Sequence, residues 1–104
     1  FDVAALRAAT WAEETVAFAY TDGKGAQTTR RVDPLGIVYM QETNMLMAWC
    51  HLRRDFRVFR LDRMDDLQIT SDSFRPRRVP MLRAYTEILR RDVLARAKDR
   101  APEG

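Results

Sequence analysis

Cysteine and histidine are almost absent from this chain of 104 residues, in which Cys50 and His51 are the only ones of their kind. A single cysteine cannot form an internal disulfide, which fits a reducing compartment such as the cytoplasm. Cysteine and histidine side by side in a strand point to opposite faces, so they can neither complete a zinc shell nor pair as nucleophile and base. We therefore expect no metal, no cofactor and no enzymatic activity.

Long apolar runs are missing as well. No stretch approaches the roughly 20 apolar residues of a membrane-spanning helix, and no signal peptide is recognisable. The sequence therefore predicts a cytoplasmic protein without membrane contact. The chain begins with Phe1 instead of methionine, and we expect it to be a piece of a longer protein.

Lysine is scarce: sixteen of the eighteen basic residues are arginine. A GC-rich genome raises the arginine count without functional meaning, whereas a nucleic-acid surface favours arginine because guanidinium groups bind phosphates and stack on bases. The charge is also uneven. Residues 1–50 carry four basic and six acidic side chains, and residues 51–100 carry fourteen and eight. This asymmetry suggests an anionic partner for the second half.

The apolar residues that are present alternate in short segments. This pattern predicts five strands separated by tight turns, at residues 15–21, 26–40, 44–51, 56–61 and 67–71. Asp33-Pro34 and Gly36 predict a bulge or sharp bend in the second strand, because proline cannot donate to a ladder. Five short strands of this kind favour a small, strongly bent antiparallel barrel of the SH3 or Sm type.

Two helices flank the strands. Residues 2–12 read as a short helix with Asp2 as its N-cap. In residues 79–98, Leu82, Tyr85, Leu89 and Val93 recur at helical spacing. The fold class is thus mainly β with flanking helices. Residues 1–78 form a barrel with its N-terminal helix, and residues 79–104 form a C-terminal helix and tail that belongs to the same domain or serves as a dimer arm.

The stretch Trp49–Arg63 concentrates the unusual chemistry. It holds five arginines, the histidine and the cysteine, with large apolar residues between the charges. Arginines among apolar side chains have to reach solvent, pair with acids or meet an anionic ligand. One interpretation is that these arginines lie on the rim of the barrel and form salt bridges there, with Arg60 or Arg63 pairing with Asp62, Asp55 or Asp33. The other is a ligand-binding surface.

The segments 34–39 (PLGIVY) and 45–64 (MLMAWCHLRRDFRVFRLDRM) resemble the WYL domain of bacterial transcription regulators. The order of a helix, a hairpin, a PLG stretch, a strand, a Leu-Arg turn and a Phe-Arg-X-Asp-Arg ending matches over about residues 3–74. The Trp-Tyr-Leu that gives the family its name is Asn44-Met45-Leu46 here, and Trp49 supplies an aromatic ring later on the same strand. The resemblance implies an Sm- or SH3-like barrel that senses an effector and controls an attached helix-turn-helix domain.

The resemblance also implies the partners. The effector would be a single-stranded nucleic acid or a nucleotide held in a basic groove, and operator DNA would bind through the helix-turn-helix part. Carried over by position, the site residues are His51, Arg53, Arg57, Arg60 and Arg63. The alternative is a homodimerisation module without a ligand, in which the arginines pair with acids across the interface. A homodimer through the 80–98 helix is expected on either reading, because Met81 and Ile88 widen its apolar stripe.

Overall fold

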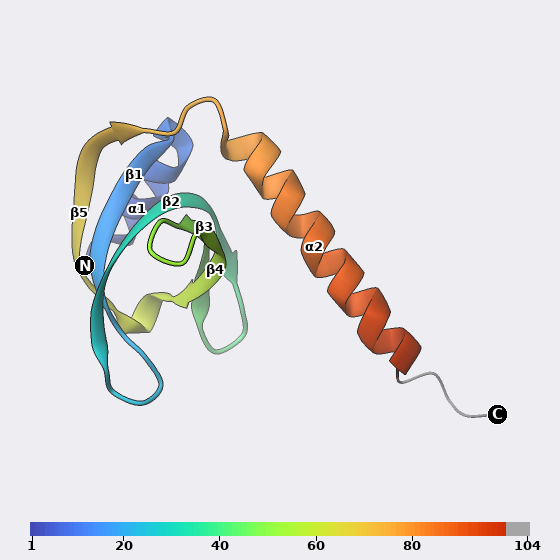
Figure 1. Cartoon of the computed structure of the whole chain (residues 1–104). Coiled ribbons are helices and arrows are strands. Elements are labelled where there is room, and N and C mark those ends of the chain that lie inside the picture. The colour runs from blue at the N-terminus through green and yellow to red at the C-terminus, as the bar shows by residue number, and fades with distance from the viewer. Residues whose placement is uncertain (100–104) are drawn as a thin grey trace.

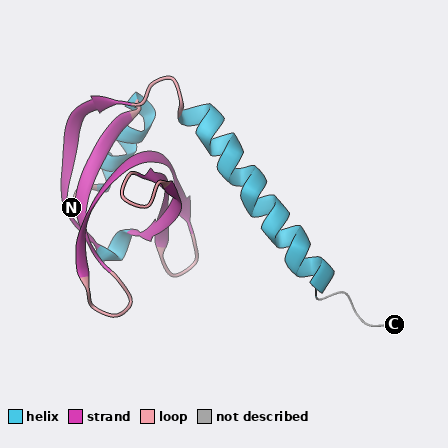
Figure 2. Ribbon diagram, viewed as in Figure 1, coloured by secondary structure: helices cyan, strands magenta, loops and turns pink. Residues whose placement is uncertain are grey.

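The structure is a computed structural model that describes residues 1–99 (Figure 1). Its helices are α1 (Val3–Ala12) and α2 (Arg78–Asp99), and a single 3-10 turn, η1, spans Leu61–Arg63. Its five strands form one sheet (Figure 2) and run as β1 (Glu14–Thr21), β2 (Gln27–Tyr39), β3 (Asn44–Cys50), β4 (Asp55–Arg60) and β5 (Met64–Ser73).

All pairings in the sheet are antiparallel, and the strand order is β4-β3-β2-β1-β5. The predicted fold class, mainly β with a short N-terminal and a longer C-terminal helix, is confirmed. The sheet bends strongly, and η1 joins its two edge strands, β4 and β5 (Figure 1). No ladder pairs these edge strands within the described residues, so full closure of the barrel stays a prediction.

The fifth strand differs most from the sequence prediction, and the bounds of the other elements shift by one residue at most. The fourth strand was expected at 56–61 and runs from Asp55 to Arg60, where η1 begins. The fifth strand was expected at 67–71, but β5 runs from Met64 to Ser73 and includes the acidic pair Asp65-Asp66. Asp66 adopts a positive φ of 51° beside a register shift against β1. Aspartate tolerates this backbone conformation, so the acidic pair bulges the strand instead of ending it.

The irregularity predicted in the second strand is present, in a strand whose side chains pack into two different cores. The register of β2 against β3 shifts between Pro34 and Gly36. Val32 packs in a first core with Phe18, Leu46 and Phe59, on the side that α1 covers. Leu35 belongs instead to a second core, completed by Met47, Phe74 and Tyr85 of α2. Val32 and Leu35 are three positions apart, so the ordinary alternation along a strand sends them to opposite faces of the sheet, and β2 contributes large side chains to both cores.

Only the first turns of α2 pack on the sheet. Met81 and Leu82 are partly buried and Tyr85 is buried, but Ile88, Leu89, Val93 and Leu94 are 39–62% exposed. The helix therefore projects from the sheet (Figure 1), and the molecule measures 55 × 34 × 25 Å along its principal axes. Neither helix of residues 1–99 has both the length and the apolar composition needed to cross a membrane.

Glu13 fixes the point at which α2 begins. Its backbone carbonyl accepts hydrogen bonds from the amide of Phe74 and the hydroxyl of Ser73. Its carboxylate accepts from the Arg78 amide at 2.9 Å and lies 3.4 Å from the guanidinium of Arg75. A carboxylate at a helix N-terminus satisfies free amides and opposes the positive end of the dipole. This clamp positions the arginines at the start of α2 over the sheet.

Candidate functional site

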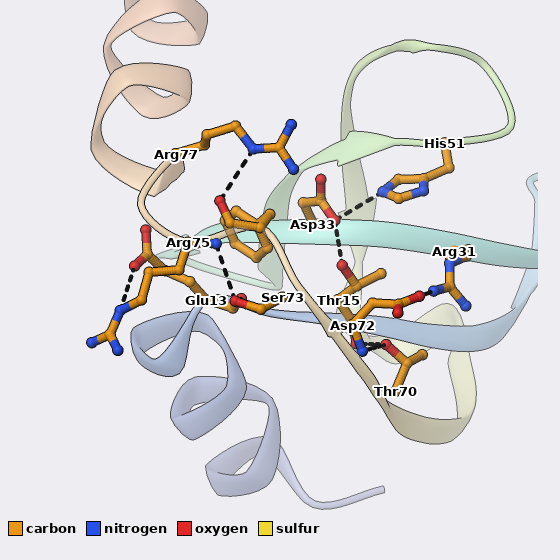
Figure 3. Close-up of polar contacts among 11 residues, drawn as sticks. Glu13, Thr15, Arg31, Asp33, His51, Thr70, Asp72, Ser73, Arg75 and Arg77 are labelled. Carbon is orange, nitrogen blue, oxygen red and sulfur yellow. Dashed lines mark hydrogen bonds and ion pairs between the residues drawn. The ribbon is translucent and has the colours of Figure 1, made fainter.

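A buried aspartate anchors the histidine that the sequence singled out. Asp33 lies on β2 and is 4% exposed, and its Oδ1 atom takes two hydrogen bonds (Figure 3). One comes from the hydroxyl of Thr15 at 2.7 Å, and the other joins Nε2 of His51 at 2.8 Å. His51 directly follows Cys50, which points into the first core, so the two side chains diverge as predicted. His51 is therefore a positioned side chain with a charged partner.

The turn after His51 presents basic side chains to solvent. Residues 51–54 connect β3 to β4, and Arg54, which has a φ of 53°, closes the turn by donating a hydrogen bond from its backbone amide to the Cys50 carbonyl. Arg53 in this turn and Arg57 on β4 are exposed. Within residues 1–99 neither forms an ion pair with a carboxylate. Their guanidinium groups are thus available to an anion.

Arg60 and Arg63 have different surroundings. Arg60 donates to both carboxylate oxygens of Asp62, at 3.1 and 2.7 Å. This bond lowers the pKa of the Asp62 carboxyl and raises the pKa of the Arg60 guanidinium. The pair matches the salt-bridged rim that was the competing interpretation of this stretch. Arg63 lies in η1 with its guanidinium near Gly23 of the β1–β2 turn.

The five predicted site residues therefore fall into two groups. His51, Arg53 and Arg57 lie around the β3–β4 turn, whereas Arg60 and Arg63 lie at the far end of β4. Arg60 lies three positions after Arg57, which places the two about 10 Å apart along the strand and on opposite faces. None of the five lines a described cavity. These five residues therefore lie on the open surface of the domain, and none of the three cavities corresponds to the predicted basic groove.

One cavity adjoins the histidine and was not predicted. Its volume is about 280 Å³, and it is lined by Asp33, Trp49, Phe56, Arg77 and Met81. The Trp49 and Phe56 rings meet edge to face at 5.0 Å, and Phe56 stacks on Tyr85 of α2 at 4.9 Å. The residues come from β2, β3, β4 and the start of α2, so no local sequence pattern could have joined them.

A second cleft of about 280 Å³ lies on the other side of the α2 start. Arg78 places its guanidinium 4.4 Å from the centre of the Trp11 ring, and Arg7 hydrogen-bonds the hydroxyl of Tyr39. Trp11 and Tyr39 are 66% and 59% exposed. No local pattern in the sequence signals the Trp11–Arg78 contact, because the two residues lie 67 positions apart in the chain.

Metal ligation has no candidate in the described part of the chain. No three histidine, cysteine, aspartate or glutamate side chains of residues 1–99 gather as a metal ion would require.

The chain is similar in sequence to a transcriptional regulator and in structure to a proteasome accessory factor. Over 60 residues the chain is 38% identical to YobV of Bacillus subtilis, an uncharacterized HTH-type transcriptional regulator, which corresponds to 58% of this chain and 19% of that protein. The proteasome accessory factor B/C (PafBC) of Arthrobacter aurescens has a similar solved structure. Its TM-score is 0.65 at 28% identity, over 72% of this chain and 12% of PafBC. The chain thus spans only a small part of each relative.

The family model for the WYL domain matches residues 2–69, which run from the N-cap of α1 into β5. This range includes the whole Trp49–Arg63 stretch on which the resemblance was based. The chain belongs to the WYL domain family.

Proposed function

We propose that this chain is the effector-sensing domain of a bacterial transcriptional regulator, and that it binds a nucleotide or a single-stranded nucleic acid. The relative in Bacillus subtilis is named as an HTH-type transcriptional regulator, and the chain corresponds to a fraction of its length. A regulator of this kind contacts operator DNA through a separate helix-turn-helix domain. Its place of action would be the cytoplasm, where the operator lies.

The observation that carries the ligand class is the basic surface at the β3–β4 turn. Arg53 and Arg57 are exposed and have no carboxylate partner within residues 1–99, and the positioned His51 lies beside them. Guanidinium groups bind phosphates bidentately and stack on unpaired bases, and both contacts suit a single strand. Arg63, which also has no ion-pair partner among those residues, could extend this surface toward η1.

The proposed mechanism is a population shift. An effector can favour one arrangement of the regulator only by as much as it binds that arrangement better. Because α2 packs on the same sheet that carries the basic turn, ligand contacts that differ with the position of α2 would supply this difference. The attached DNA-binding domain would then gain or lose operator affinity.

A salt titration tests the proposal. Fluorescence anisotropy measures the binding of labelled single-stranded oligonucleotides at low and moderate ionic strength. If Arg53, Arg57 and Arg63 each contact one phosphate, log Kd changes with log salt by a slope of about 2, or roughly twentyfold between about 50 and 200 mM. In Arg57→Ala the slope falls by about 0.7. Negligible binding at both ionic strengths would contradict the proposal.

A matched variant controls for overall charge. Arg91 is an exposed arginine on the projecting half of α2, paired with Glu87 at 3.4 Å. Arg91→Ala removes the same charge as Arg57→Ala, but it lies away from the β3–β4 turn. Its affinity and salt slope are expected to equal those of the wild type. Equal losses in both variants would mean that net charge alone drives binding.

The apolar residues of projecting α2 favour a second candidate function, homodimerisation. Ile88, Leu89 and Val93 lie on adjoining positions of the helix surface and are 43%, 39% and 62% exposed. Contiguous exposed apolar side chains on a small domain are typical of an interaction surface. We expect a second copy to cover this stripe. Dimerisation and effector binding use different surfaces, so both functions can belong to one domain.

A further inference from the structure

The cavity under the start of α2 contains an unused hydrogen-bond acceptor. Asp33 is 96% buried, and its Oδ1 atom already accepts from Thr15 and bonds His51 (Figure 3). Its Oδ2 atom has no hydrogen-bond partner among residues 1–99. In this part of the chain, every side-chain oxygen or nitrogen that is fully buried does have a hydrogen-bond partner, so Oδ2 is not fully buried. Oδ2 must therefore reach the surface of the cavity that Asp33 lines.

The opposite wall carries hydrogen-bond donors. Arg77 lines the same cavity, and its Nε atom donates to the carbonyl of Phe74 at 3.2 Å (Figure 3). This bond holds the guanidinium in place, and both Nη atoms have no ion-pair or hydrogen-bond partner within residues 1–99. An accessible carboxylate oxygen of an otherwise buried residue, Asp33, and the positioned guanidinium of Arg77 thus border the same cavity.

Aromatic walls define the shape of a ligand for this space. The ring planes of Trp49 and Phe56 cross at 78°, so the two rings are nearly perpendicular. A flat ring can stack on one of them while its edge meets the other. The volume of about 280 Å³ lies just under the usual range of about 300–1,000 Å³ for small-molecule sites, which leaves room for one ring system.

We propose that this cavity binds a guanine base, presented by a nucleotide or by a single strand. Guanine places its N1–H donor next to O6 and N7, two acceptors on one side that a single guanidinium can bridge, whereas thymine and uracil have their two acceptors on opposite sides of N3–H. Asp33 Oδ2 accepts from N1–H, and the Nη atoms of Arg77 donate to O6 and N7, the pairing that arginine makes most often with guanine. Adenine would turn its N6 amino group toward these donors. The inference rests on the proposed function and adds a base-recognition site to its phosphate surface.

The position of His51 connects the proposed base site in the cavity with the phosphate-binding arginines of the β3–β4 turn. Its ring is bonded to the carboxylate that opens into the cavity, and it begins the turn that carries Arg53. The cavity and the arginine-bearing turn are thus neighbours on the surface, so a strand with one base in the cavity can bring another of its phosphates to the turn. Neighbouring residues would serve base recognition and phosphate binding.

The test compares strands that differ in one base. A short labelled strand of abasic units carries guanine, adenine or no base at its centre, so that all three have the same phosphate charge. With the full chain in anisotropy titrations, the guanine strand should bind at least about tenfold more tightly than the other two. Guanosine monophosphate should compete with the guanine strand if a free nucleotide can be the source. Failure of this competition alone would assign the site to strands.

Asp33→Asn is the sharpest variant. The two donors from Thr15 and His51 keep the amide oxygen at the Oδ1 position, so the amide NH₂ replaces Oδ2 and faces the cavity. The guanine advantage should disappear, while binding of the abasic strand stays unchanged. If thermal melts show that this variant is unfolded, Met81→Trp decides instead. It fills the cavity from α2 and should remove the same advantage.

The outcomes separate this inference from the proposed function. Salt-dependent binding that is equal for the three strands would overturn the guanine site and leave the phosphate surface standing. A guanine advantage that survives in both Asp33→Asn and Met81→Trp would also overturn it, because the base would then bind elsewhere. No binding of any strand or of guanosine monophosphate would overturn both proposals.

Discussion

The contact between Phe56 and Tyr85 should be the main energetic link between α2 and the sheet. Tyr85 is 7% exposed, and its ring stacks on Phe56 with 4.9 Å between centroids and 9° between planes. Met81 and Leu82 are the only other residues of α2 packed on this core within residues 1–99, and both are only partly buried. Losing the stack should therefore loosen the helix that forms one wall of the cavity.

A double-mutant cycle measures this contact. Phe56→Leu and Tyr85→Leu keep apolar volume but remove one ring each, and each should destabilise the domain by about 1–2 kcal/mol. An aromatic pair contributes about 0.5–1.5 kcal/mol beyond its buried area. The double variant should therefore lose about 1 kcal/mol less than the two single losses added together. Against a total stability of roughly 5–15 kcal/mol for a domain of this size, these losses are measurable.

Urea denaturation followed by circular dichroism gives the free energies of unfolding. Arg83→Ala serves as a control on the same helix, because Arg83 is exposed and lies outside the proposed dimer stripe, so its loss should stay within about 0.5 kcal/mol. The reasoning would be refuted by a coupling energy near zero together with a Tyr85→Leu loss no larger than that of the control. Such a result would mean that α2 does not rest on the sheet in solution.

Four shorter predictions follow. Burial raises the pKa of the Tyr85 phenol, so the unfolded chain loses this proton first and stability falls as pH rises above about 10; Tyr85→Phe should flatten that fall in pH-dependent urea melts. Thr15→Val should cost about 1 kcal/mol in the same melts, because buried Asp33 loses a donor. Arg60→Ala should leave the melting temperature nearly unchanged, because its pair with Asp62 is exposed, and a drop of several degrees would show a structural role. Ile88→Glu should shift a dimer to monomer in light scattering, whereas a wild type that is monomeric at high concentration would exclude the dimer.

Periodicity predicted the parts of the fold that depend on local sequence. The alternation in residues 15–21 predicts Val16, Phe18 and Tyr20 on the buried face of β1; Val16 and Phe18 are at most 1% exposed, and Tyr20 is partly buried. The N-cap at Asp2 and the bulge near Pro34 also follow from local backbone chemistry. The extent of β5 did not follow, because an acidic pair can end a strand or bulge it, and only the pairing with β1 decides between the two.

The candidate site was less predictable than the fold because its contacts are long-range. The sequence marked His51 and the arginines by composition, and it offered Asp62, Asp55 or Asp33 as partners for Arg60 or Arg63 without deciding among them. In the structure Asp33 forms hydrogen bonds with Thr15 and His51, each eighteen positions away along the chain. Arg60 turns to Asp62, two residues away. Which acidic side chain pairs with which basic one depends on strand register and on the bend of the sheet, and neither can be predicted from residue spacing.

The geometry of α2 links the two proposed functions. Arg77 and Met81, at its start, line the cavity, and Ile88 and Val93, farther along, lie on the exposed stripe. A base held against Arg77 and Met81 would stabilise the docked position of the helix and so restrict where the stripe points. A second copy that binds the stripe in that position would, by reciprocity, strengthen base binding by the same factor by which the base strengthens the dimer. Affinity for the guanine strand should then rise with protein concentration in the wild type and stay constant in Ile88→Glu, and a constant affinity in both would separate the two functions.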